Sequence, residues 1–193
     1  RFLMADPFWY EIGTSSRTLD TNDSATTRYV AGRLRSTGQW DDLGLTADPD
    51  NAGGESGTIY AIAYNPYNGL IYVGGDFDNM DSVAGRDFIA SYDPASDSWA
   101  SLAVANAPAD IVRAIAIAPN GDVYIGGDFL NVGDANGDRV AYYDISAGSW
   151  ASLAAGGGAA GGDVYALAFD QEGTLYIGGA FPNWNADGDQ SGI

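Results

Sequence analysis

The sequence predicts an all-β protein built from repeated antiparallel units of four short strands. A string of Tyr, Val or Ile, Gly, Gly, Asp or Ala, and Phe begins at Tyr72, Tyr124 and Tyr176, so it recurs every 52 residues. No window has the apolar spacing of i, i+3, i+4 and i+7 that marks an amphipathic helix. The 27 Gly residues punctuate the apolar segments, as tight turns between strands require.

The first two strands of each unit are predicted as a β-hairpin, because alternating apolar and small residues surround a turn that ends in Gly. The stretches begin at Ala61, Ala114 and Ala166, and their turns end at Gly69, Gly121 and Gly173. The Gly pair that follows permits close backbone approach or a positive φ, and its Phe is expected to fill the core. The first two copies of the string have Asp76 and Asp128, but the third has Ala180 at the same position. This difference argues against a catalytic carboxylate shared by the repeats.

The third and fourth strands are predicted from a small residue that is followed by Trp nine residues later and by Leu three residues after that. The three copies are Ala31, Trp40 and Leu43, then Ala90, Trp99 and Leu102, then Ala141, Trp150 and Leu153. We expect the Trp and Leu side chains to be core wedges. Arg28, Arg86 and Arg139 precede the third strands and are expected to bridge neighbouring units.

Four strands per unit and a repeat of 52 residues fit the blade of a β-propeller of the kelch length class. The WD40 class has a shorter repeat, and its Gly-His signature is impossible in a chain without His. A solenoid of stacked sheets is the alternative architecture. The propeller is favoured because four-stranded units that end in a Trp wedge suit radial packing, in which each blade buries its faces against its neighbours.

The repeat places a partial propeller after a short N-terminal region. The expected boundaries are 1–27 for an N-terminal strand and linker and 28–193 for the propeller, with a half blade at 28–45, blades at 57–103 and 111–153, and a half blade at 163–193. The polar stretch 14–27 is expected to be the linker. Propellers typically have about four to eight blades, so we expect an incomplete ring or a fragment of a longer chain.

Charge and composition exclude several classes of function. Asp and Glu number 26 against 8 Lys and Arg, a net charge of −18, so nucleic acids and anionic membrane surfaces should repel the chain. His and Cys are absent, which excludes zinc sites with His or Cys ligands and Ser-His-Asp catalysis. No apolar run reaches the ~20 residues of a spanning helix, so no membrane insertion is expected. We therefore expect a protein that is not an enzyme.

The abundance of Asp fits turn residues, calcium ligands or the solvated surface of a halophilic protein. Calcium is suggested by two loops, 131–138 and 183–189, in which Asp and Asn alternate around Gly as in the first half of a calcium-binding loop. The candidate calcium ligands are Asp134, Asn136, Asp138, Asn185, Asp187 and Asp189. The bidentate Glu that completes such a loop is missing, so a tight polar turn is the alternative.

Trp184 is the candidate ligand-binding residue. It lies in the second of these loops, at the position that Met80 and Val132 hold in the other copies. An indole ring in a variable loop can stack on a sugar or on a protein partner. Packing of the ring within its own loop is the alternative.

Two regions resemble known families. Residues 70–77, 89–93 and 99–102 carry strings similar to the kelch-like, galactose-oxidase-type propeller repeats of bacterial extracellular and phage-associated proteins. The crosslinked Cys of galactose oxidase is absent, so the resemblance implies the fold and no oxidase activity. Residues 1–10 resemble the strand and Asp-Pro-aromatic turn of siphophage distal tail proteins. That second resemblance implies a tail-tip polypeptide that binds a host surface or neighbouring tail subunits.

Three functions are therefore expected, in order of preference. The first is a non-catalytic structural or receptor-binding propeller of a phage-like tail or extracellular assembly, located in a virion tail or outside the cell. Its partners would be other tail or surface-assembly subunits and a host surface glycan. The second is a secreted cell-surface adhesion or carbohydrate-binding propeller. The third is a carboxylate-based glycosidase, because residues 144–150 resemble the Asp-box turn of sialidase propellers.

Overall fold

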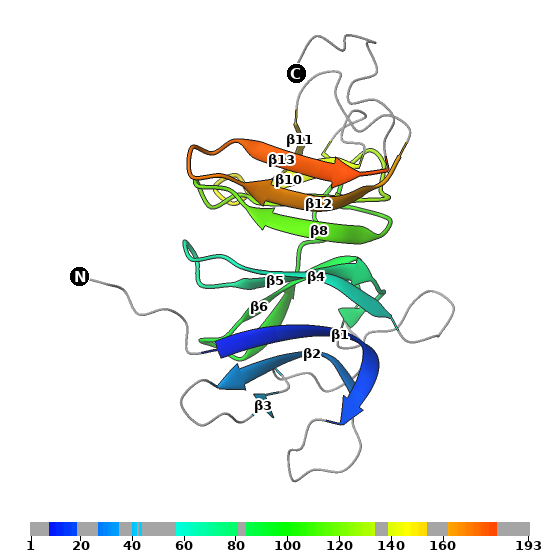
Figure 1. Ribbon diagram of the computed structural model, residues 1–193, viewed down its shortest axis with the longest axis vertical. Helices are drawn as coiled ribbons and strands as arrows, with labels where there is room; N and C mark the ends of the chain where they lie inside the picture. Colours follow the sequence, from blue (N-terminus) through cyan, green and yellow to red (C-terminus); the bar gives the residue numbers. More distant parts are fainter. Residues whose placement is uncertain are drawn as a thin grey trace, which may run out of the picture.

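The computed structural model describes residues 8–18, 27–34, 40–41, 43, 57–80, 84–133, 139–153 and 162–180. Within these ranges the chain forms thirteen strands, β1 to β13, in four antiparallel sheets and contains no α-helix (Figure 1). The prediction of an all-β protein with four-stranded antiparallel units is confirmed. In the described part of the chain no helix is long and apolar enough to cross a membrane.

Two of the sheets are complete units in which each strand pairs with the next along the chain. The first contains β4 (Thr58–Tyr64), β5 (Ile71–Asp76), β6 (Ile89–Asp93) and β7 (Ser98–Ser101), and the second contains β8 (Val112–Ile117), β9 (Val123–Gly127), β10 (Val140–Asp144) and β11 (Ser149–Ser152). The registers are equivalent, because Val73 faces Ala90 as Ile125 faces Ala141. The 52-residue repeat of the sequence is thus a repeat of strand pairing.

The N-terminal sheet contains a strand that the repeat did not reveal. β1 (Phe8–Thr18) pairs with β2 (Thr27–Leu34), which pairs in turn with β3 (Trp40–Asp41). Glu11 faces Ala31 as Val73 faces Ala90, so β1 takes the place of a second strand. This differs from the expected linker at 14–27, since residues 14–18 continue β1. A strand was expected within 1–27, but its place in the propeller sheet was not, because β1 has no Gly-Gly pair and lies outside the 52-residue spacing.

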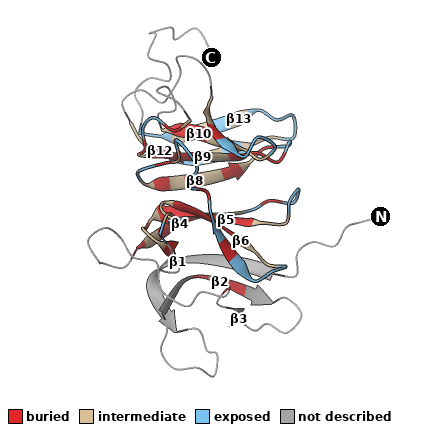
Figure 2. Cartoon of the chain, turned by 180° about the vertical axis from the view of Figure 1, so that it is seen from behind, coloured by how far each residue is buried: buried red, intermediate tan, exposed pale blue. Residues whose placement is uncertain are grey.

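The remaining sheet is a hairpin of β12 (Val164–Phe169) and β13 (Leu175–Gly179). First strands of successive units pack side by side, β4 against β8 and β8 against β12, while β1 packs against β4 (Figure 1). Hydrophobic clusters fill the spaces between successive sheets, where Val30 and Leu43 meet Ile59 and Trp99 in the first cluster. Figure 2 shows buried residues along β4, β5 and β8, which face these clusters.

The Gly pair at the end of the second strand is required by close approach on both sides. A Cβ atom on Gly74 would lie 2.6 Å from Val112 Cγ1 of the next sheet, and one on Gly75 would lie 2.1 Å from the Thr58 carbonyl oxygen. Real Cβ atoms are not found at such distances, so only Gly fits. Gly127 repeats the second contact, since its Cβ would lie 2.0 Å from the Ile111 carbonyl oxygen. The predicted scaffold role of this motif is therefore explained by packing.

Trp99 and Trp150 each tie their unit to the unit before it. The Nε1 of Trp99 donates to the Leu43 carbonyl at 2.8 Å, and the Nε1 of Trp150 donates to the Leu102 carbonyl at 3.0 Å. Both indole rings are buried, as predicted for core wedges. In the unit of Trp99 and Leu102, the Trp donates to the Leu carbonyl of the preceding unit and the Leu carbonyl accepts from the Trp of the following unit.

Turn formation accounts for several of the Asp residues. Asp144 accepts hydrogen bonds from the backbone amides of Ser146 and Ala147, and Asp93 accepts one from Ala95 in the equivalent turn. Asp170 does the same in the hairpin of β12 and β13. These amide bonds lower the pKa of all three carboxyl groups below their ordinary value. At these positions the turn interpretation of the acidic composition is confirmed.

Candidate functional site

The first strand of three successive units has a β-bulge at the same place. Pairing skips one residue in β4, one in β8 and one in β12, and the skipped residues are Tyr60, Arg113 and Tyr165. A bulge leaves one residue out of the ladder and redirects its side chain. We refer to these three residues as the bulge row.

The bulge row forms a stack in which a cation lies between two aromatic rings. The Arg113 Cζ atom is 5.3 Å from the centre of the Tyr60 ring and 5.5 Å from the centre of the Tyr165 ring. Both distances fall in the range of cation–π attraction. Tyr60 is 39% exposed and Tyr165 is 51% exposed, so the row is open to solvent and to a partner.

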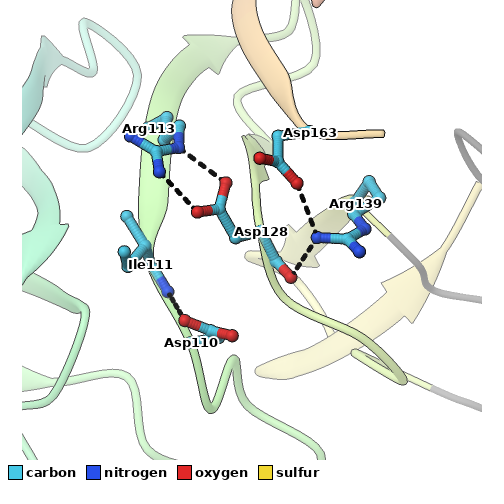
Figure 3. A network of polar contacts seen from close by, with 6 residues as sticks. All are labelled: Asp110, Ile111, Arg113, Asp128, Arg139 and Asp163. Carbon is cyan, nitrogen blue, oxygen red and sulfur yellow. Dashed lines mark hydrogen bonds and ion pairs between the residues drawn. The ribbon is translucent and has the colours of Figure 1, made fainter. Parts of the chain in front are cut away.

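Asp128 fixes the guanidinium of Arg113. Arg113 Nε donates to Asp128 Oδ1 at 2.6 Å, and Nη2 donates to Oδ2, which makes the pair bidentate (Figure 3). Bidentate pairing is the strongest geometry for an arginine and a carboxylate. Hydrogen bonding to Asp128 raises the pKa of Arg113 above its ordinary value, so the cation persists at any physiological pH.

Arg139 connects this pair to the next sheet. Its Nη1 donates to the Asp128 backbone carbonyl and, at 2.8 Å, to Oδ1 of Asp163, which directly precedes β12 (Figure 3). The predicted bridging role is confirmed for Arg139. Arg86 donates to the Trp99 carbonyl at 2.7 Å within its own sheet, and the side chain of Arg28 lies outside the described residues.

The complete sheet formed by β4 to β7 contains a second copy of the Asp128 position. Asp76 follows the Gly pair and faces Thr58, as Asp128 follows its Gly pair and donates its backbone amide to Ile111. In this copy the bulge residue is Tyr60, not Arg. Asp76 is half-buried, and in the described part of the chain no hydrogen bond or ion pair reaches its carboxylate.

The sequence-predicted site residues lie elsewhere. The six candidate calcium ligands, at 134–138 and 185–189, and Trp184 all fall outside the described residues. Within the described residues, no group of three or more acidic side chains is placed to hold a metal ion. Calcium binding and the role of Trp184 therefore stay predictions.

Sequence reasoning missed the bulge row, although a signal for it was present. Aligning the repeats places Arg113 beside Tyr60 and Tyr165 in the other copies, a charged residue among aromatic ones. The bulge that turns these side chains outward depends on the Gly pair opposite, because the displaced backbone of the first strand occupies the space of a Cβ. That coupling between strands becomes visible only in the structure.

Comparison with known families identifies the fold at the level of a domain. Residues 90–189 match the model of the Rax2 C-terminal beta propeller domain. The chain belongs to this propeller family. No curated protein matches the chain. The Rax2 match supports the propeller and does not show the kelch-like or phage-tail identity that the sequence strings suggested.

Solved structures agree with the propeller fold. The extracellular domain described for a hybrid two-component system of B. thetaiotaomicron has 10% identity and a TM-score of 0.54, and the match covers 81% of this chain and 18% of that one. The extracellular domain described for a one-component system of the same organism has 12% identity, a TM-score of 0.50 and the same coverage. The chain thus spans about 18% of the length of these structures. Such low identities show the fold alone.

A third solved structure, described as a gluconolactonase, has 12% identity and a TM-score of 0.47, and the match covers 78% of this chain and 50% of that one. A likeness of this size supports no inference about catalytic activity. The possible activity of the chain is therefore considered from its own residues.

Proposed function

We propose that this propeller is a non-catalytic recognition module and that it binds its partner at the bulge row. The observation that supports the proposal is the placement of two exposed Tyr rings and one fixed Arg on three successive sheets at one register. Tyr and Arg are the residue types, with Trp, that contribute most to binding energy at protein interfaces. A rigid arrangement of this kind loses little conformational entropy on binding.

The partners of Asp128 and Asp144 support binding and not catalysis at these two carboxylates. Both oxygens of Asp128 accept hydrogen bonds from Arg113, so this carboxylate is not free to accept a proton from a substrate. Asp144, in the turn that resembles an Asp box, holds backbone amides. A glycosidase needs two carboxyl groups facing one another across the scissile bond. Asp128 and Asp144 have structural partners instead.

We further propose an extracellular setting, because two solved structures that resemble the chain, with TM-scores of 0.54 and 0.50, are extracellular domains of their own proteins. Surface-assembly subunits and host glycans are then the candidate partners. A phage-tail component is a narrower form of the same proposal and depends on residues 1–10. The described residues of that segment, 8–10, lie in β1, which pairs with β2.

The proposal is tested with arrays of glycans and of basic, acidic and neutral peptides, probed with the native protein and with Y60A/Y165A. We expect ligands that the native protein retains and that the double variant binds at least tenfold more weakly. Y176A is the matched control, because Tyr176 is 58% exposed and lies near the turn of its hairpin, away from the bulge. Equal binding by native protein and double variant would refute the site, and release of products from any glycan would refute the non-catalytic role.

A further inference from the structure

The internal repeat places an Asp at equivalent positions of the two complete sheets, Asp76 and Asp128, and the two carboxylates differ in their partners. Asp76 is the last residue of β5 and Asp128 directly follows β9, and each comes directly after the Gly pair of its sheet. Asp76 faces Thr58, and Asp128 donates its backbone amide to Ile111, so each lies opposite the stretch just before the bulge. Asp128 binds the guanidinium of Arg113 from its own sheet. The position equivalent to Arg113 in the Asp76 sheet is held by Tyr60, which supplies no cation.

Tyr60 is already engaged in a way that leaves the Asp76 carboxylate available. The Tyr60 ring lies against Arg113 of the following sheet, with 5.3 Å between the ring centre and Cζ. Asp76 is half-buried and, among the residues that the structure describes, receives no hydrogen bond or ion pair. Carboxylates that are partly withdrawn from water are more stable when a cation pairs with them. The Asp76 carboxylate is therefore available as an acceptor, whereas the equivalent carboxylate of Asp128 accepts two hydrogen bonds from Arg113.

We infer that Asp76, together with the Tyr60 ring, binds an arginine side chain of a basic segment on a protein partner. This inference rests on the proposed function and names the class of its ligand. The bound guanidinium would pair with Asp76 as Arg113 pairs with Asp128 and would lie beside Tyr60 as Arg113 does. The bulge row, in which Arg113 lies between the rings of Tyr60 and Tyr165, would then gain the guanidinium of the partner next to Tyr60.

Two observations select a guanidinium from a basic segment over other ligands. Asp128 accepts two parallel hydrogen bonds from Arg113, so the Asp at this position of the repeat can bind a guanidinium with both oxygens. Arg provides this geometry and Lys does not. The net charge of −18 also attracts basic segments over a distance and repels acidic ones. A neutral glycan supplies no charge for Asp76.

The test measures binding of a tetra-arginine peptide to the native protein, to D76N and to E172Q by calorimetry at physiological salt. Glu172 is exposed and lies in the turn of the hairpin formed by β12 and β13, so E172Q removes the same charge at a distant place. We expect D76N to weaken binding at least tenfold and E172Q to weaken it less than twofold. Equal effects of the two substitutions would show that the attraction is only long-range, and would overturn the inference.

A second variant keeps the inference falsifiable if D76N alters folding. Y60R introduces a guanidinium at the bulge position of the Asp76 sheet, equivalent to that of Arg113 in the Asp128 sheet. It is expected to abolish peptide binding while the circular dichroism spectrum stays native. Tetra-arginine binding as tight as that of the native protein would contradict the inference. If Y60A/Y165A loses its ligands on the arrays while tetra-arginine binding is independent of Asp76, this inference fails and the proposed function stands. If Y60A/Y165A keeps its ligands on the arrays and tetra-arginine binding is also independent of Asp76, both the proposed function and this inference fail.

Discussion

The two complete sheets have the same backbone and different functional side chains. In both, four strands pair in chain order, a Gly pair ends the second strand, and a buried Trp donates to a Leu carbonyl of the preceding unit. They differ at the bulge, where one sheet has Tyr60 and the other has Arg113 bound to Asp128. The equivalent Asp76 receives no side-chain hydrogen bond or ion pair from the residues that the structure describes. Positions that the packing dictates are thus repeated, while positions that face solvent vary.

The loop before the third strand shows the same contrast. Phe88 and Arg139 occupy equivalent places and both have left-handed backbone angles, with φ of 57° and 65°. Residues other than Gly seldom adopt this region. Phe88 packs against the core between the sheets, whereas Arg139 reaches Asp163 of the next unit. One strained backbone position therefore supports an apolar contact in one sheet and an ionic link in the other.

The largest expected effect is that of the second Gly in each pair. G75A and G127A should each destabilise the protein by about 3 kcal/mol or more, because the added Cβ would meet a backbone oxygen that cannot move without breaking the bulge. Urea unfolding followed by circular dichroism measures the loss. G178A is the control, since its nearest atom is the Ala166 Cβ at 3.6 Å. Tolerance of Ala at either of the first two positions would mean that the two sheets do not share this packing.

The Trp links come next. W99F and W150F retain most of the buried ring but remove the Nε1 donor, so the Leu43 or Leu102 carbonyl loses its partner. We expect each substitution to cost about 1 to 3 kcal/mol, the range for an unsatisfied buried polar group. Similar costs in the same unfolding assay would support equivalent links. A loss in only one of the two variants would show that the sheets are joined differently.

Substituting each Asp in turn compares the carboxylate that is paired with Arg113 with its equivalent in the other sheet. D128N should destabilise the protein by about 1 to 2 kcal/mol, because it weakens a bidentate ion pair whose side chains are 27% and 16% exposed. D76N should change stability by less than about 0.5 kcal/mol, since it removes no ion pair formed among the described residues. The difference between the two unfolding free energies is the measurement. Equal losses would mean that Asp76 already has a cationic partner.

The smallest expected effect concerns the turn carboxylates. The pKa of Asp93 and the pKa of Asp144 are lowered in the folded state, chiefly by the backbone amides of Ala95 and Ala147. Their contribution to stability is therefore present above the ordinary carboxyl pKa of 3.8 and is lost as the pH falls below it. Melting temperatures between pH 6 and pH 3 should fall, and D93A and D144A should each reduce that fall slightly. An unchanged pH dependence in both variants would contradict the turn assignment.

The sequence predicted most of the scaffold because the scaffold is what the repeat preserves. Strand order, the Gly turns and the buried Trp residues follow from spacing that packing enforces at every copy. β1 was not recognised as a blade strand, since it achieves the same pairing with Trp9, Tyr10 and Ile12 and without the Gly pair. The bulge row could not be predicted, because its geometry arises from backbone displacement against the neighbouring strand.

The equivalence of Asp76 and Asp128 is the central claim, and a double-mutant cycle tests it most directly. Unfolding free energies are measured for the native protein, Y60R, D76N and Y60R/D76N. If the two positions are equivalent, the new Arg pairs with Asp76 as Arg113 pairs with Asp128, and the cycle gives a favourable coupling of about 1 kcal/mol. A coupling within about 0.3 kcal/mol of zero would contradict the claim, because it would mean that the carboxylate of Asp76 does not face the bulge.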